Sequence, residues 1–168
     1  YGSAVLNTNH GVLDLAFDVL PGGSFVFMIM SKELQFGQLT LTGFTGLISE
    51  QGISGQAFLS INGYSALMDI FYGDNSNFYA SMEHGSLSMG SLSLTDMNLL
   101  IDSSGNVQGG CNAYLPAFGG SIETNIYFSN DLFVFAFSLP VIDINGIHYR
   151  NLSGIISPSE VVLNGELY

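Results

Sequence analysis

Three histidines and one cysteine are the residues of this chain best suited to metal chemistry. His10, His84 and His148 lie far apart, and by the spacing of the internal repeat described below they share no structural position. A zinc site needs three or four converging ligands, and these histidines with Cys111 have no usual ligand spacing. We therefore predict no metal site.

Carboxylates, serines and Cys111 are the candidates for catalysis. Asp14 and Asp18 lie on the polar face of one predicted strand, about 13 Å apart at a rise of about 3.3 Å per residue, which is too far for a glycosidase pair. No serine lies in a Gly-x-Ser-x-Gly elbow, and Cys111 has no basic neighbour to activate its thiol. We predict that the chain is not an enzyme, with no catalytic residue and no cofactor.

Two turns are rich in oxygen atoms, at residues 74–77 and 102–106. Calcium takes six to eight oxygen ligands, and neither turn has the glutamate that completes a strong calcium loop. Asx-turn hydrogen bonds explain both segments. We expect at most a weak calcium contact.

Aromatic side chains are candidates for stacking on sugars. The chain has thirteen Phe, eight Tyr and no Trp. The phenylalanines lie in apolar runs typical of a core. Five tyrosines are better candidates for a sugar platform: Tyr64, Tyr72, Tyr79, Tyr114 and Tyr127.

The composition restricts the partners. Fourteen acidic residues face only Lys32 and Arg150, so the net charge is −12. This charge repels phosphate backbones and anionic head groups, which excludes nucleic-acid binding. Mean hydropathy is +0.38, but no stretch approaches the 18 or more apolar residues of a membrane helix, so no membrane insertion is expected. Few lysines and one cysteine suit a secreted bacterial protein, and Tyr1 is expected to begin a mature product.

An internal repeat organises the chain. Apolar runs begin at Phe25, Phe78 and Phe133, which are 53 residues (78 − 25) and then 55 residues (133 − 78) apart. The first of these offsets also relates Ile48 to Ile101. Self-similarity at a fixed period is typical of repeat architectures. The predicted repeats form a single domain and cover about residues 11–63, 64–118 and 119–168.

Each repeat is predicted to hold four β-strands. In the first repeat, apolar and polar residues alternate from Leu13 to Val19, which is the period of a half-buried strand. The run Phe25–Met30 is apolar on both faces, and Lys32–Glu33 is expected to turn the chain. Two further strands follow at residues 39–47 and 53–61.

The fold expected from this pattern is all-β, with about twelve antiparallel strands. We favour an elongated sandwich or stack of the repeats, and a β-trefoil or β-prism is the alternative. Residues 1–10 fall outside the repeat. We expect them to form an N-terminal extension without a strand, which is a candidate donor segment for a neighbouring chain.

The second strand of the repeat points to a function. An uncharged strand that is apolar on both faces aggregates if it is left on a free edge, unless it joins another chain. Strand addition between subunits uses such an edge, and repeated head-to-tail contacts give a fibre. The predicted subunit interface comprises Ala4, Val5, Leu6, Phe25, Phe27, Ile29, Phe133, Phe135 and Phe137.

Residues 89–96, with the sequence MGSLSLTD, are similar to the Gly-Ser-Leu-Ser-Leu strands of secreted bacterial surface proteins, the FilA-like pilus or fibre components. Residues 36–42 and 145–149 match this pattern more loosely. The resemblance implies a non-enzymatic, fibre-associated role at the cell surface.

Architecture and resemblance lead to one functional hypothesis with two alternatives. We predict a structural subunit of an extracellular filament or cell-surface layer, which forms a homopolymer by β-strand addition. The first alternative is a lectin-like threefold carbohydrate-binding module, so a glycan contact stays open. The second is an outer-membrane β-barrel.

Overall fold

The computed structural model describes residues 1–73, 78–157 and 160–168. Within these ranges the chain is all-β apart from one turn of 3₁₀ helix, η1 (Pro116–Phe118). The strands are β1 (Gly2–Thr8), β2 (Gly11–Val19), β3 (Phe25–Phe36), β4 (Leu39–Ser49), β5 (Gly52–Ile61), β6 (Tyr64–Tyr72), β7 (Phe78–Met89), β8 (Leu92–Ile101), β9 (Val107–Leu115), β10 (Gly120–Ser129), β11 (Leu132–Ile144), β12 (Ile147–Ile156) and β13 (Val161–Leu167).

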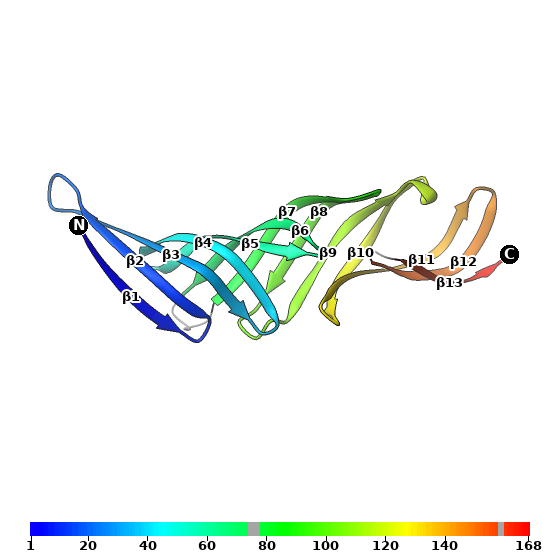
Figure 1. Cartoon of the computed structure of the whole chain (residues 1–168). Helices are drawn as coiled ribbons and strands as arrows, with labels where there is room; N and C mark the ends of the chain where they lie inside the picture. The colour runs from blue at the N-terminus through cyan, green and yellow to red at the C-terminus, as the bar shows by residue number, and fades with distance from the viewer. Residues whose placement is uncertain (74–77, 158–159) are drawn as a thin grey trace. The chain divides into compact units, whose positions relative to one another are not determined.

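These thirteen strands form one sheet in sequence order, in which each strand lies beside the next (Figure 1). The registers are antiparallel, as for Phe17 opposite Phe27 between β2 and β3. The turn between β10 and β11 is tight: Asn130 and Asp131 have φ of +51° and +60°, which a type I′ hairpin turn requires. The predicted all-β class with antiparallel strands is confirmed. The favoured sandwich or stack of repeats is not confirmed, because all the described strands belong to one sheet, and neither is the trefoil or prism alternative.

The N-terminal segment differs from its prediction, because residues 1–10 contain β1. In this strand Leu6 lies opposite Leu13 and Ala4 opposite Leu15, so its alternate residues continue the apolar face of β2. Seven residues with small and polar members carry too little periodicity for the sequence to predict such a strand. β1 is the strand in addition to the predicted twelve.

The turn expected at Lys32–Glu33 is also wrong. β3 runs through both residues, and Glu33 pairs with Thr42 in β4. The chain turns instead at Gly37, whose φ of +57° a residue with a side chain rarely adopts. Charge alone therefore misplaced the turn, and glycine marks it.

The chain divides into two compact units, which we describe separately. Unit 1 comprises Tyr1–Ser60, Ser65–Ser81 and Leu100–Asn106. Unit 2 comprises Ile61–Tyr64, Met82–Leu99 and Val107–Tyr168. In each unit we call the buried face of the sheet the inner face and the other the outer face.

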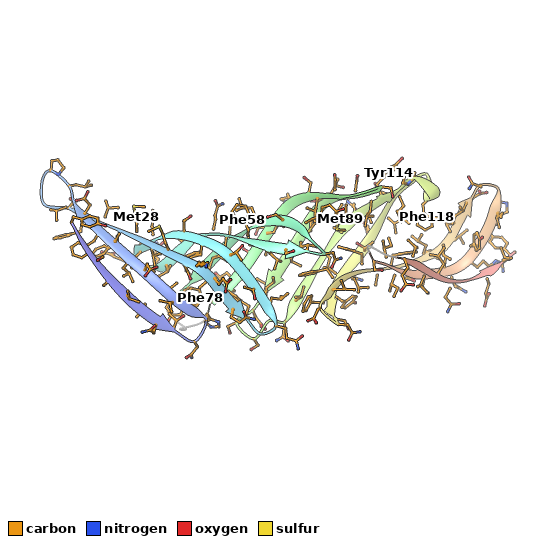
Figure 2. All side chains as sticks on the ribbon, viewed as in Figure 1. Met28, Phe58, Phe78, Met89, Tyr114 and Phe118 are labelled. Atoms are coloured by element: carbon orange, nitrogen blue, oxygen red, sulfur yellow. The ribbon has the colours of Figure 1, made fainter. Side chains whose placement is uncertain are left out.

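The core of unit 1 forms because the sheet bends. Phe36 in β3 and Phe78 in β7 are four strands apart in the sheet, yet their ring centroids are 6.3 Å apart. Both side chains are fully buried, and Phe78 is labelled in Figure 2. The His10 ring contacts both, with centroid distances of 5.3 and 5.2 Å. Burial of each of the two phenylalanine side chains contributes roughly 1.5–3 kcal/mol to the free energy of folding.

The core of unit 2 contains a long-range polar contact beside its buried phenylalanines. Asn62, in the turn before β6, donates from Nδ2 to the Phe133 carbonyl (2.7 Å), and the Phe133 N–H donates to Asn62 Oδ1 (2.8 Å). The pairing of β11 with β12 starts only at Phe135. β10 pairs with the start of β11 on one side, and on the side of β12 the Asn62 amide takes the place of a neighbouring strand.

Left-handed backbone conformations recur at the spacing of the predicted repeat. Two sets of three residues with φ between +49° and +65° are each separated by 53 and then 55 residues. The sets are Gly37, Gly90 and Asn145, which lie in turns, and Gly43, Asp96 and Asn151, which lie within strands.

Candidate functional site

Five of the nine predicted interface residues lie on the surface of unit 1. Ala4, Val5 and Leu6 are exposed on β1. Phe25 and Phe27, at the start of β3, are 58% and 39% exposed. The two phenylalanines stack with a centroid distance of 6.2 Å at the tip of the β2–β3 hairpin.

The other four predicted interface residues are buried. Ile29 is in the core of unit 1, and Phe133, Phe135 and Phe137 are in the core of unit 2, none more than 5% exposed. Their side chains lie on the inner face and are not available to a neighbouring chain. An apolar run has the same sequence signature in a core and at an interface, so the pattern could not separate the two groups.

Sequence reasoning missed the most exposed apolar strand, β13. All of its residues are exposed, and among the described residues it pairs with β12 alone. Val161, Val162 and Leu163 are each nearly half exposed, and Leu167 is 70% exposed. The run Val161–Leu163 was the only signal available in the sequence. No other described strand pairs with its outer edge, where N–H and C=O groups lie beside apolar side chains.

A hollow of about 630 Å³ lies on the outer face of unit 1, over β3 to β7. Met28, Leu47 and Phe71 contribute apolar surface to it, and the backbone of Gly46 and Gly55 is part of its lining. Figure 2 labels Met28, which is half exposed. We call this feature the outer hollow.

The outer hollow also contains a hydrogen-bonded polar pair. Gln56 on β5 donates from Nε2 to Asp69 Oδ1 on β6, at 2.9 Å. Both side chains are exposed, and Thr45 and Ser81 continue the polar lining on either side of them. Phe71 lies opposite Tyr79 on β7, with a centroid distance of 5.4 Å, so an exposed second ring extends the aromatic wall.

Unit 2 has a polar hollow of about 440 Å³ on β8 to β11, lined by Asp96, Asn112 and Glu123 among others. Beside it, His84 Nδ1 lies 2.5 Å from Asp96 Oδ1. This hydrogen bond, and then the Asp96 charge, raise the pKa of His84 above its usual 6.5. The other candidate ligands that adjoin hollows are Cys111, in the lining of this one, and His10, in a hollow of unit 1, and the partner of His84 is one carboxylate.

The remaining candidate residues are held in structural roles. Asp102 Oδ1 accepts hydrogen bonds from the N–H groups of Ser104 and Asn106, and the Asn106 side chain donates to Oδ2. These bonds, that of the Asn106 side chain first, lower the pKa of Asp102. The turn is thus an Asx-type turn. The other oxygen-rich turn, at residues 74–77, lies outside the described residues.

Cys111 is a buried thiol in unit 2. Burial raises its pKa, and its Sγ lies 3.1 Å from Thr124 Oγ1. Asp14 and Asp18 are exposed on β2, as a solvated strand face predicts. Among the described residues, no three His, Cys, Asp or Glu side chains come close enough together to hold a metal ion.

The five tyrosines proposed as sugar contacts divide by exposure. Tyr64, Tyr79, Tyr114 and Tyr127 are exposed, and Tyr72 is half-buried against Phe78. Of the exposed four, Tyr79 is the one whose ring adjoins the outer hollow, through Phe71.

Comparison with known proteins identifies no relative. No family model, no curated protein and no solved structure matches this chain. The FilA-like resemblance therefore remains a hypothesis from one strand motif. Among the described residues there is no helix with the length and apolar character needed to cross a bilayer.

Proposed function

We propose that this chain is a non-enzymatic structural subunit of an extracellular filament or cell-surface layer, which self-assembles by β-strand addition. The observation that carries the proposal is β13, a strand with every side chain exposed and one edge unpaired among the described residues. A strand in this state gains main-chain hydrogen bonds and covers apolar surface when a second chain adds to it.

The exposed end of unit 1 supports the same proposal. Phe25 and Phe27 expose aromatic surface at the hairpin tip, and β1 presents Val5 and Leu6 beside an edge with which no other described strand pairs. We infer that β13 of one copy and β1 of the next supply the two halves of a head-to-tail contact, because unlike surfaces give an open fibre. Of the nine predicted interface residues, only the five exposed ones remain in the proposed interface, to which β13 is added.

A three-repeat organisation, in which the four-stranded repeats follow one another along the sheet, is part of this proposal. The recurrence of left-handed residues at Gly37, Gly90 and Asn145 supports it, since turns with the same backbone geometry return at the spacing of the apolar runs. Repeats that contact their neighbours propagate readily into long assemblies.

The test is sedimentation velocity and negative-stain electron microscopy over a range of protein concentrations. We expect polymers whose length rises with concentration. Lysine in place of Val162 or Leu163 should abolish them, because a charge on an edge strand blocks pairing.

The matched control is Phe58→Lys, which places the same charge at an equally exposed apolar residue within β5, away from both edges. This variant should assemble normally. A chain that stays monomeric at every concentration, or a control as defective as the β13 variants, overturns the proposal.

A further inference from the structure

The outer hollow has an arrangement that strand addition does not use. Two rows of side chains cross the outer face of β3 to β7. The first row is mainly apolar: Met28 lies opposite Leu47 and Phe71 opposite Tyr79, while Ser54 on β5 lies opposite Leu47 and interrupts the row. The second row is polar from β4 to β7, with Thr45 opposite Gln56 and Asp69 opposite Ser81, and on β3 it begins with Met30 opposite Thr45. Exposed apolar and polar strips side by side suit a ligand that is itself apolar on one face and polar at its edge.

Two glycines set the depth of the hollow. Gly46 and Gly55 lie opposite each other on β4 and β5. A Cβ on either would collide with a carbonyl of the facing strand and with the ring of Phe44, which is buried on the inner face. Their absent side chains let the backbone approach Phe44, so the outer surface sinks between Met28 and Phe71.

The acceptor oxygens of the polar row favour a ligand that donates hydrogen bonds. Asp69 is held in place by the Gln56 N–H, and the exposed carboxylate and amide oxygens can accept further hydrogen bonds. The hydroxyls of Thr45 and Ser81 can donate or accept. The two neighbouring hydroxyls of a vicinal diol can donate hydrogen bonds to these oxygens and can also accept them from the Thr45 and Ser81 hydroxyls. A simple amine would use Asp69 and leave the other three groups without a role.

Charge narrows the ligand further. Among the described residues no lysine or arginine lines the hollow, and the chain carries a net charge of −12. Uronic acids, sialic acids and phosphorylated sugars are therefore disfavoured. A neutral sugar ring has an apolar C–H face for Phe71 and Tyr79 and hydroxyls at its edge for the polar row.

From these contacts we infer that the outer hollow binds a short neutral oligosaccharide. The site lies within unit 1 and includes no residue of β1 or β13, so it is independent of the proposed strand addition. A surface protein with this site would bind glycan through the outer face of its sheet and other copies of the same chain through its edge strands.

The experiment is isothermal titration of the purified chain with a panel of neutral gluco-, manno-, galacto- and chito-oligosaccharides, checked by NMR shifts of backbone amides. We expect at least one to bind, with shifts confined to β3 to β7. Phe71→Ala and Asp69→Asn should each weaken that binding about tenfold or more. Asp69→Asn keeps the size of the side chain and an oxygen for Gln56, so its fold should be unchanged by circular dichroism.

Two controls make the result decisive. Tyr127→Ala removes an exposed tyrosine of unit 2 and should leave binding unchanged, and Phe71→Tyr should restore most of what Phe71→Ala loses. Failure of the whole panel overturns the inference, as does binding that both site variants leave intact. Binding of Nα-acetyl-lysine amide, whose ε-ammonium group is charged, would show a cation site instead if salt and Asp69→Asn both abolish it.

Discussion

His84 and Asp96 form a hydrogen-bonded pair on the surface of unit 2, across β7 and β8. Both have left-handed backbones, with φ of +51° and +50°, and the His84 N–H donates to Asn98 Oδ1. The backbone therefore brings the imidazole to the carboxylate. The charge of Glu83 adds a smaller effect in the same direction to the raised pKa of His84.

This pair predicts a pH dependence. Because the folded-state pKa of His84 lies above its usual 6.5, its contribution to stability is complete below that pH and is lost as the pH rises through the raised value. In an NMR titration, Asp96→Asn should lower the midpoint of His84 towards 6.5. Asp143→Asn, which removes the carboxylate beside His148 instead, should not move it. Equal His84 midpoints in the wild type and Asp96→Asn would contradict the prediction.

Single residues were predictable where local chemistry decides. The Asx-type turn at Asp102 depends on groups only two and four residues away, and both the Ser104 N–H and the Asn106 side chain donate to the Asp102 carboxylate. The partner of Gln56 was not predictable, since Asp69 reaches it only through the pairing of β5 with β6. The exposure of Phe25 and the burial of Phe133 likewise depend on what covers each strand.

At the scale of elements, the start of β11 depends on the side chain of Asn62. Replacement by alanine removes both hydrogen bonds to Phe133 and leaves backbone groups without partners, at a cost of about 1–3 kcal/mol. Alanine also strains the left-handed backbone of this residue, whose φ is +52°. We expect Asn62→Ala to lower the free energy of unfolding in urea by at least this amount.

Two further variants separate the loss of the hydrogen bonds from the strain of the left-handed backbone. Asn62→Gly tolerates the left-handed backbone, so it should lose only the hydrogen-bond part of the effect. Asn145→Gly changes another left-handed turn residue and should alter stability by a few tenths of a kcal/mol. If Asn62→Gly is as stable as the wild type, the contact does not stabilise β11.

Strands were the most predictable elements, and their ends the least. Alternation or apolar runs marked β2 and the first half of β3, because period two follows from strand geometry. β1 escaped prediction because Gly2, Ser3 and Asn7 interrupt its pattern. The turn at Gly37 was misplaced because a charged dipeptide resembles a turn, whereas β3 pairs straight through it.

For the whole molecule, charge opposes the proposed assembly. Copies of a chain with net charge −12 repel one another, so strand addition must overcome that repulsion. Raising the ionic strength from about 0.01 to about 0.15 M shortens the Debye length from roughly 30 to 8 Å. We expect faster polymer growth over this range, measured by light scattering.

The assembly variants test whether this salt response depends on strand addition at the sheet edge. Val162→Lys should fail to polymerise at either salt concentration, because it blocks the edge itself, whereas Phe58→Lys should keep the salt response. Polymer growth that slows as salt is added would mean that attraction between charges, and not apolar contact, drives association.

The sequence by itself determined the class of fold and the net charge, from which we predict that phosphate-bearing partners are disfavoured. Period-two alternation, glycine-rich turns and the scarcity of helix formers are local properties, and a charge of −12 needs no structure to repel phosphate. Tertiary structure alone decided which apolar runs are core. Phe25 and Phe133 open similar runs, yet Phe25 is exposed at a hairpin tip and Phe133 is buried in the core of unit 2. The outer hollow likewise exists only because strands bring Met28, Gln56, Asp69 and Phe71 onto one face.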